Sequence, residues 1–158
     1  MIQTWGIGLD GARDKAKKIY KKIGTIPCPF FSDESVSFTS RRFEHILRDK
    51  GKRLRPVSQR LIRLRLIEYV EAIIKNEDGK VHVEFRDEYE IERYVNRHGE
   101  KILEKKKARF WAFYADIGGC KIKVVIGQIE GGKKEFLSVM TNKFEIHQDD
   151  KTQTKNPA

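Results

Sequence analysis

Apolar positions repeat with the period of a helix in three stretches of the first half of the chain. In residues 10–23 and 57–76 they recur at steps of three and four, as on one face of an α-helix. A shorter stretch, residues 41–49, has the same period, with Ser40 placed to cap it and Gly51 beyond its end. The pattern therefore predicts three helices before residue 77.

From residue 81 onward the period falls to two, which is the period of a strand. Residues 81–85 alternate apolar and polar side chains. Three more strand-like segments are separated by Gly-Gly turns: residues 109–117, 121–129 and 135–140. Between them, residues 87–97 suit either an extended hairpin or a helix, so residues 86–108 stay ambiguous. Helices followed by a meander predict an α+β fold, with the N-terminal helices packed on an antiparallel sheet.

The 158 residues divide into three segments around a single core. Residues 1–34 hold the first helix and a connector with two prolines, which favour extended backbone. Residues 35–147 form the α+β core, opened by a short strand over residues 36–39. Residues 148–158 are a polar tail.

Charge changes this picture, because it is concentrated in one place. The formal net charge is +10, and residues 41–65 hold ten Lys or Arg against two acids, a net of +8. Phosphate is the simplest partner for such a density, since each cation that meets a phosphate releases a condensed counterion. The basic segment predicts a nucleic-acid interface.

Membrane, metal and cofactor functions find no support in the sequence. No apolar run reaches the roughly 18 to 20 residues that span a bilayer, and the N-terminus lacks the pattern of a secretory signal. Cys28 and Cys120 have no CxxC spacing, which favours free thiols in a reducing compartment. The 4 histidines lack the spacing of metal ligands. We expect a cytoplasmic protein with no metal, cofactor or membrane partner.

The basic turn between the second and third helices supplies the candidate phosphate contacts. Its nucleic-acid-binding candidates are Arg41, Arg42, Lys50 and Lys52. Arg60, Arg63 and Arg65 lie within the long helix, where their charges could bind a phosphate or only solvate the helix. Arginines in the middle of a helix more often do the latter, so they are left outside the site. His45 lies at the edge of the buried stripe, where neighbouring cations should lower its pKa and keep it neutral. The alternative for His45 is an ordinary surface histidine.

Aromatic residues gather in the strand over residues 109–117. Phe110, Trp111, Phe113 and Tyr114 could stack nucleic-acid bases. Alternation in a strand places Phe110 and Tyr114 on one face and Trp111 and Phe113 on the other, so half of the cluster must be core. The sequence does not indicate which face is open.

Several of these features together resemble a known nuclease group. An extended Val36-Ser37-Phe38-Thr39 enters a helix containing Glu44-His45-Ile46, and a basic turn and a long helix follow. The meander ends in Val139-Met140-Thr141-Asn142. Over about residues 35–145 this arrangement resembles the barnase, EndoU, colicin and RelE-like nuclease superfamily, especially its phage- and toxin-associated branches.

The resemblance implies a metal-independent endoribonuclease that cleaves RNA by attack of the 2′-hydroxyl and leaves a 2′,3′-cyclic phosphate. It implies that His45 is an acid or base and that Arg53 and Arg55 are phosphate clamps. Thr141 would complete the catalytic set and Lys143 would contact the nucleic acid at the end of the last strand. No second histidine is obviously paired with His45, and His98 is the one candidate in the ambiguous region.

The partners implied are RNA, with tRNA as one candidate substrate, and a cognate inhibitor or immunity protein. The alternative function is a non-catalytic basic nucleic-acid-binding module that uses the same patch. Such a module would bind RNA with strong salt dependence and without turnover.

Overall fold

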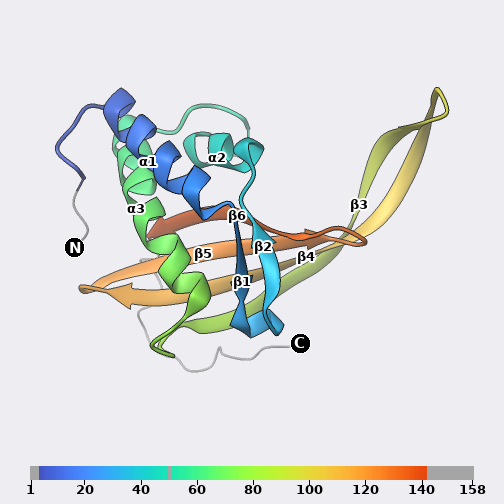
Figure 1. The fold of residues 1–158 in the computed structure, drawn as a ribbon. Helices are drawn as coiled ribbons and strands as arrows, with labels where there is room; N and C mark the ends of the chain where they lie inside the picture. Colours follow the sequence, from blue (N-terminus) through green and yellow to red (C-terminus); the bar gives the residue numbers. More distant parts are fainter. Residues whose placement is uncertain (1–3, 50, 142–158) are drawn as a thin grey trace.

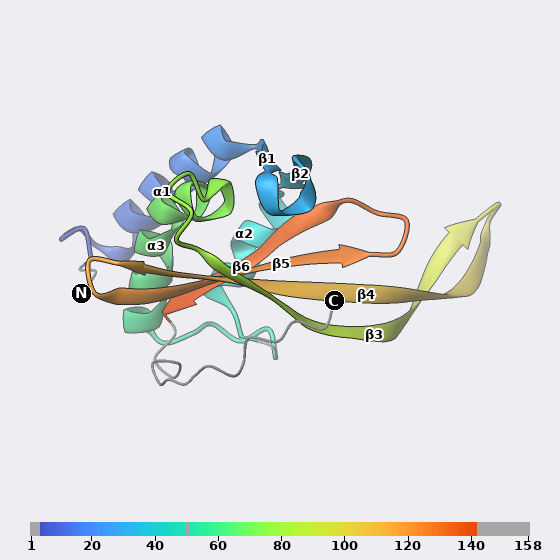
Figure 2. The ribbon, with the colours of Figure 1, turned by 90° about the horizontal axis from the view of Figure 1, so that it is seen from below.

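Three helices cover one face of a single six-stranded sheet in the computed structural model, which describes residues 4–49 and 51–141. Figure 1 shows the elements along the chain, with α1 above the strands β4 to β6, and Figure 2 shows the molecule from below. The elements are α1 (Leu9–Ile23), β1 (Thr25–Cys28), a 3-10 turn (Pro29–Phe31), β2 (Glu34–Ser37), α2 (Ser40–Leu47), α3 (Val57–Lys75), β3 (His82–Arg97), β4 (Glu100–Ile117), β5 (Cys120–Ile129) and β6 (Lys134–Thr141). The predicted α+β class is confirmed.

The strand order is β1-β2-β6-β5-β4-β3. The predicted antiparallel meander is confirmed for β3 to β6. One join is parallel, where Val36 and Ser37 of β2 pair with Lys134 and Glu135 of β6. The connector expected before β2 is itself a strand, β1, which pairs antiparallel with β2. β1 tolerates Pro27 because it is an edge strand, where a missing N–H breaks no ladder on its outer side.

The core lies between the helices and the inward face of the sheet. α3 buries six side chains there: Leu64, Leu66, Ile67, Val70, Ile73 and Ile74. In β4, Phe113 is fully buried and Trp111 packs against the same core, whereas Phe110 and Tyr114 are not among the residues packed there. Alternation along β4 is therefore as predicted, and Phe110 and Tyr114 lie on the face that the helices leave uncovered.

An aromatic cluster fixes α2 against the sheet. The Tyr20 ring of α1 makes edge contacts with Phe38, Phe43 and Phe136, with centroids 5.1–5.8 Å apart. Its hydroxyl donates to the carbonyl of Thr39 at 2.7 Å. Thr39, and not Ser40 as expected, caps α2 by accepting the Arg42 N–H at 3.4 Å. The position of α2, and with it His45, thus depends on α1.

The ambiguous segment is extended, and the helical alternative for residues 87–97 is wrong. β3 and β4 pair without a break in direction from His82↔Tyr114 to Arg97↔Glu100. β5 stops pairing with β4 at Ala108↔Ile129. Beyond that point β3 and β4 continue as a two-stranded ribbon that projects from the body (Figures 1 and 2). We call this ribbon, residues 88–107, the arm.

A buried lysine joins the β1–β2 hairpin to the meander. Lys134 is 8% exposed and donates to the Glu34 carboxylate at 2.7 Å. Its ammonium also lies 4.7 Å from the ring centroid of Phe31 and 5.4 Å from that of Trp111. β2 and β6 share only two register pairs, so the contact between Lys134 and Glu34 helps to hold these two strands together.

We expect Glu34→Gln to lower the free energy of unfolding by about 1–2 kcal/mol, because the Lys134 ammonium would lose its charged partner. Lys134→Met should cost less, since it removes the buried ion and keeps an apolar chain over Phe31 and Trp111. Urea denaturation of both variants measures the difference. A larger loss in Lys134→Met would contradict this account of the join.

Candidate nucleic-acid interface

The basic turn after α2 is closed by its own backbone. The Asp49 N–H donates to the Arg53 carbonyl at 2.8 Å, and the Arg55 N–H donates to the Leu47 carbonyl at 2.9 Å. The Asp49 carboxylate accepts the N–H groups of Gly51 and Arg53 at 2.9 and 3.0 Å. The hydrogen bond from the Arg53 N–H is the main reason that the pKa of Asp49 is lowered. Asp49 thus holds the turn in one shape.

Two arginines from different helices meet the last strand. On one side β6 pairs with β5, but on the other β2 pairs with only its first two residues. Along the remaining edge, Arg63 of α3 donates to the Val139 carbonyl at 3.2 Å. Arg42 of α2 donates through Nε to the Glu135 carboxylate at 3.2 Å. A basic side chain is therefore brought to each end of β6.

Arg55 and Arg60 are also held by main-chain carbonyls. Arg55 Nε donates to the Ile46 carbonyl at 3.1 Å, and Arg60 Nε donates to the Arg55 carbonyl at 2.8 Å. Within residues 4–49 and 51–141, no carboxylate forms an ion pair with Arg55, Arg60 or Arg63. A guanidinium has five N–H donors, so each keeps donors beyond its backbone contact. We call Arg42, Arg55, Arg60 and Arg63 the arginine cluster.

Repulsion inside the arginine cluster is visible at Arg63. Burial, and to a smaller extent the positive charge of Arg55, together lower the pKa of Arg63 to about 10. The guanidinium stays charged at neutral pH, so its unfavourable environment persists. A bound anion would relieve both effects, because it supplies the missing counter-charge and replaces lost hydration.

His45 lies exposed on α2 beside this cluster. Partial burial lowers the pKa of His45 below its usual 6.5, and the charges of Arg42, Arg41 and Lys52 lower it further. The expected direction of this shift is confirmed. A neutral imidazole at pH 7 can accept a proton, which is the state that a general base requires.

The structure brings together only some of the residues predicted for the site. Arg41, Arg42 and Lys52 are close enough to His45 for their charges to act on it, and Arg55 reaches α2 through Ile46. Thr141 is half-buried and ends β6, two residues beyond the carbonyl that Arg63 contacts.

Arg53 lies apart from the arginine cluster. Its side chain is 84% exposed and its charged neighbour is Asp49, at 3.9 Å. Lys50 and Lys143 lie outside the described residues. His98 lies in the turn at the far end of the arm, away from α2 (Figure 1), so it is not placed to pair with His45.

The sequence analysis missed Arg63 and Glu135. The interpretation of Arg63 as a solvated helix residue is wrong, because its side chain is half-buried and its guanidinium donates to the Val139 carbonyl of β6. One feature of the sequence could have indicated Arg63. Arg60 and Arg63 are three residues apart, so they lie on the same face of the helix, and they closely follow the basic turn. Arg65 points elsewhere, to Glu68 at 2.7 Å and over Trp5. No feature of the neighbouring sequence indicates Glu135, because its partner Arg42 is 93 residues away along the chain.

No group of three or more His, Cys, Asp or Glu in the described part of the chain could hold a metal ion. The helices that the structure describes include none that is long and apolar enough to cross a bilayer.

Inorganic phosphate should raise the melting temperature of the wild-type protein, because an anion that binds only the folded arginine cluster stabilises it. At a phosphate concentration about tenfold above its Kd the gain is about 1.4 kcal/mol. Arg55→Gln/Arg63→Gln should lose this gain, measured from its own phosphate-free baseline by calorimetry at constant ionic strength. Lys18→Gln/Lys22→Gln removes two exposed charges of α1 and serves as the control. Equal gains in both double variants would contradict an anion site at the cluster.

Comparisons with known proteins identified no relative of this chain. No family model matches the chain, and no curated protein or solved structure matches it. The functional proposal therefore rests on the chemistry of the arginine cluster and His45.

Proposed function

We propose that the arginine cluster binds RNA phosphates and that the protein is a metal-independent endoribonuclease with His45 in its active site. The observation that carries the proposal is that His45 lies in the field of Arg41, Arg42 and Lys52, in the same cluster region where Arg55 and Arg63 contact main-chain carbonyls and have no carboxylate partner among the described residues. Cations held by backbone carbonyls keep their full charge available, whereas a carboxylate partner neutralises part of the charge of an ion-paired cation. The site therefore suits a phosphodiester better than a neutral ligand.

The chemistry supports RNA as the substrate, because RNA carries its own nucleophile. Neutral His45 would take the proton from a 2′-hydroxyl, and the oxygen would attack the adjacent phosphorus. The bond to the 5′-oxygen breaks, leaving a 2′,3′-cyclic phosphate and a 5′-hydroxyl. Arg55 and Arg63 would stabilise the charge that builds on the phosphoryl oxygens, a contribution that is often the largest in such reactions.

The leaving 5′-oxygen takes a proton from water or from a second group. Two residues of β6, Thr141 and Glu135, are candidates for positioning that water or group. Glu135 shares Arg42 with His45, since Arg42 hydrogen-bonds the carboxylate and also lowers the histidine pKa. RNA, including tRNA, is the proposed substrate, the cytoplasm is the proposed compartment, and an inhibitor protein is a proposed partner that would cover this basic surface.

A second candidate function is an RNA-binding module without catalysis. One observation favours it: in the described part of the chain no hydrogen bond orients the His45 ring. A general base is usually held by a neighbour that fixes its tautomer. Binding without turnover would make this second function the better one.

RNA binding should depend on the arginine cluster and Lys52. The triple variant Lys52→Gln/Arg55→Gln/Arg63→Gln should weaken binding and reduce the slope of log K against log salt by about 2, or about 0.7 for each lost phosphate contact on a single strand. The control Lys17→Gln/Lys18→Gln/Lys22→Gln removes the same total charge from α1. Titration of a labelled RNA at several salt concentrations measures both slopes. The same slope in both variants would mean that only net charge matters.

Cleavage should depend on His45. His45→Ala should keep the fold and RNA affinity, because the side chain is exposed, and should lose about 10²-fold or more in cleavage rate, the usual contribution of a general acid or base. Products from wild-type protein should end in a 2′,3′-cyclic phosphate, and excess chelator should leave the rate unchanged. Full activity of His45→Ala would remove the histidine from the mechanism, and products with a free 3′-hydroxyl would overturn the mechanism itself.

The pH profile tests the role of His45 as a base. Since the pKa of His45 is lowered, the rate should stay high at neutral pH and fall only below pH 6.5, as the imidazole becomes protonated and can no longer accept a proton. In the same range RNA affinity should rise, because protonation adds a cation beside the arginine cluster. A profile of kcat/KM and Kd between pH 5 and 8 separates the two trends. A rate that rises on acidification would assign His45 the role of acid instead.

A further inference from the structure

The arm is a ribbon with two chemically different faces. Beyond Ala108↔Ile129 no third strand supports it, and two-stranded ribbons are marginal in water by themselves. Alternate residues point to opposite sides, so Tyr89, Arg93 and Arg97 share one face of β3, while Glu88, Glu90 and Tyr94 share the other. The first face continues the side of the sheet that the helices leave uncovered, because it also carries Phe110. We call it the open face of the arm.

A stacked aromatic pair lies where the open face leaves the sheet. The rings of Tyr89 and Phe110 are 5.2 Å apart and inclined by 21°. Tyr89 is 50% exposed, so Phe110 covers only part of it. Phe110 is supported from below, because a Cβ on Gly127 would come within 3.2 Å of its ring and within 2.6 Å of Leu137. The pair is thus a rigid, half-exposed aromatic surface.

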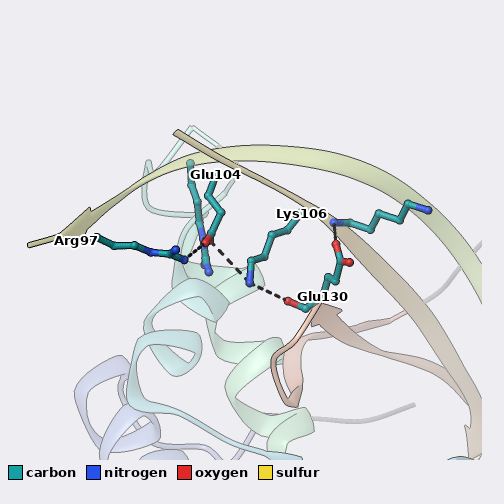
Figure 3. Close-up of polar contacts among 6 residues, drawn as sticks. Arg97, Glu104, Lys106 and Glu130 are labelled. Carbon is teal, nitrogen blue, oxygen red and sulfur yellow. Dashed lines mark hydrogen bonds and ion pairs between the residues drawn. The ribbon is translucent and has the colours of Figure 1, made fainter. Parts of the chain in front are cut away.

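Three cations converge on one carboxylate farther along the open face. Glu104 accepts from Arg97 at 2.6 Å and from Arg93 at 3.3 Å, and Lys106 lies 3.9 Å away. Figure 3 shows these contacts and the bond from Lys106 to the Glu130 carbonyl, at 3.4 Å. A single carboxylate cannot neutralise three cations, so the group keeps a positive excess. The side chains of Arg93 and Arg97 remain 46% and 59% exposed.

The opposite face of the arm lacks this combination. Its glutamates on β3 face cations on β4, with Glu88 bound to Arg109 at 2.8 Å and Glu92 at 3.7 Å from Lys105. Tyr94, 69% exposed, lies opposite Leu103 there and has no ring partner among the described residues. Each face therefore offers one tyrosine. Tyr89 on the open face is held by stacking on Phe110, whereas Tyr94 on the opposite face is not held by a second ring in the described part of the chain.

We propose that the open face of the arm binds single-stranded RNA, with an unpaired base stacked on Tyr89 and the following phosphates beside Arg93 and Arg97. Aromatic side chains bind the planar faces of bases without regard to sequence, and arginines follow the backbone. Tyr89 and Arg93 are four residues apart in a strand, a distance of about 13 Å, which leaves room for a short run of nucleotides. The inference rests on the proposed function and adds that the substrate is single-stranded where it meets the arm.

Stacking, and not charge, supplies the larger share of this binding. Asp87 and Glu100 lie at the two ends of the open face, so the face as a whole is close to neutral. The arm should therefore add affinity with little salt dependence, whereas the arginine cluster adds affinity that falls steeply with salt. This difference separates the two sites experimentally.

The test is the affinity of arm variants for a 2′-O-methyl oligonucleotide of about 12 nucleotides, within the range that single-strand sites cover. The 2′-O-methyl group prevents cleavage, because no 2′-hydroxyl is present. Tyr89→Leu should weaken binding by about tenfold or more, the usual effect of losing a stacked base, and should leave the salt slope unchanged. Tyr89→Phe should bind as the wild type does. Tyr94→Leu makes the same change on the opposite face and should alter binding less than twofold.

Two further measurements separate the outcomes. A duplex of the same length should bind equally to wild type and Tyr89→Leu, since its bases are not free to stack. The melting temperature shows whether each variant stays folded. Equal losses in Tyr89→Leu and Tyr94→Leu, or no loss in either, would overturn the inference, and no loss in either would favour a protein partner for the arm.

The outcome also distinguishes this inference from the proposed function. If Arg55→Gln/Arg63→Gln weakens RNA binding and Tyr89→Leu does not, the arm proposal alone is wrong. If the wild-type protein binds no RNA, the proposed function is wrong and the inference falls with it.

Discussion

The arrangement of the arginine cluster depends on one incompletely paired strand. β6 has β5 along one side, but β2 pairs with only its first two residues on the other. Backbone carbonyls buried without a partner are costly, and here Arg63 satisfies that of Val139. The same contact draws a guanidinium out of water without bringing a carboxylate to it. The Val139 carbonyl thus receives its hydrogen bond from a charged side chain. The positive charge of Arg63 makes the edge of β6 suited to an anion.

The position of His45 follows from the same constraint. α2 lies beside β6, where Arg42 reaches Glu135 at the end of the part that β2 covers, and the aromatic cluster around Tyr20 anchors the start of the helix. His45 is one turn further along α2, so it shares the field of Arg42. Its lowered pKa comes first from partial burial of the ring, and then from the charges of Arg42 and Arg41 on α2 itself and of Lys52 in the basic turn.

The arm is held by a different balance of forces. Its root is locked where the Glu130 carboxylate accepts the Lys107 N–H at 3.1 Å and so continues the ladder after β5 ends. The Tyr89–Phe110 stack lies just before that point, and beyond it cross-strand ion pairs such as Lys105–Glu92 take the place of the third strand. Each exposed ion pair contributes little to the stability of the arm. A bound ligand would therefore add contacts that the arm lacks when it is free. Two sites on one rigid sheet, one electrostatic and one aromatic, would raise the affinity for a single RNA beyond either alone.

Periodicity alone determined which segments are helices and which are strands, because the 3.6- and 2-residue repeats depend only on neighbours along the chain. It also determined the α+β class. The distribution of charge along the chain located the basic turn and gave the direction of the His45 pKa shift, although partial burial is its larger cause. The face of β4 that holds Phe110 was separable from that of Trp111 by alternation, but only packing against α3 decided which face is open. Locally, residues 87–97 allowed two structures, and pairing with β4 selected the extended one.

The site itself was decided by contacts between residues far apart in sequence. Arg63 and Arg65 are two positions apart on one helix and equal in local character, yet one reaches β6 and the other covers Trp5. A helix turns by about 100° per residue, so the partner of each arginine depends on which elements surround α3. Likewise Glu135 meets Arg42 only because β6 inserts beside β2. Local sequence therefore set the charge that was available, and tertiary packing decided which of those charges remained unpaired.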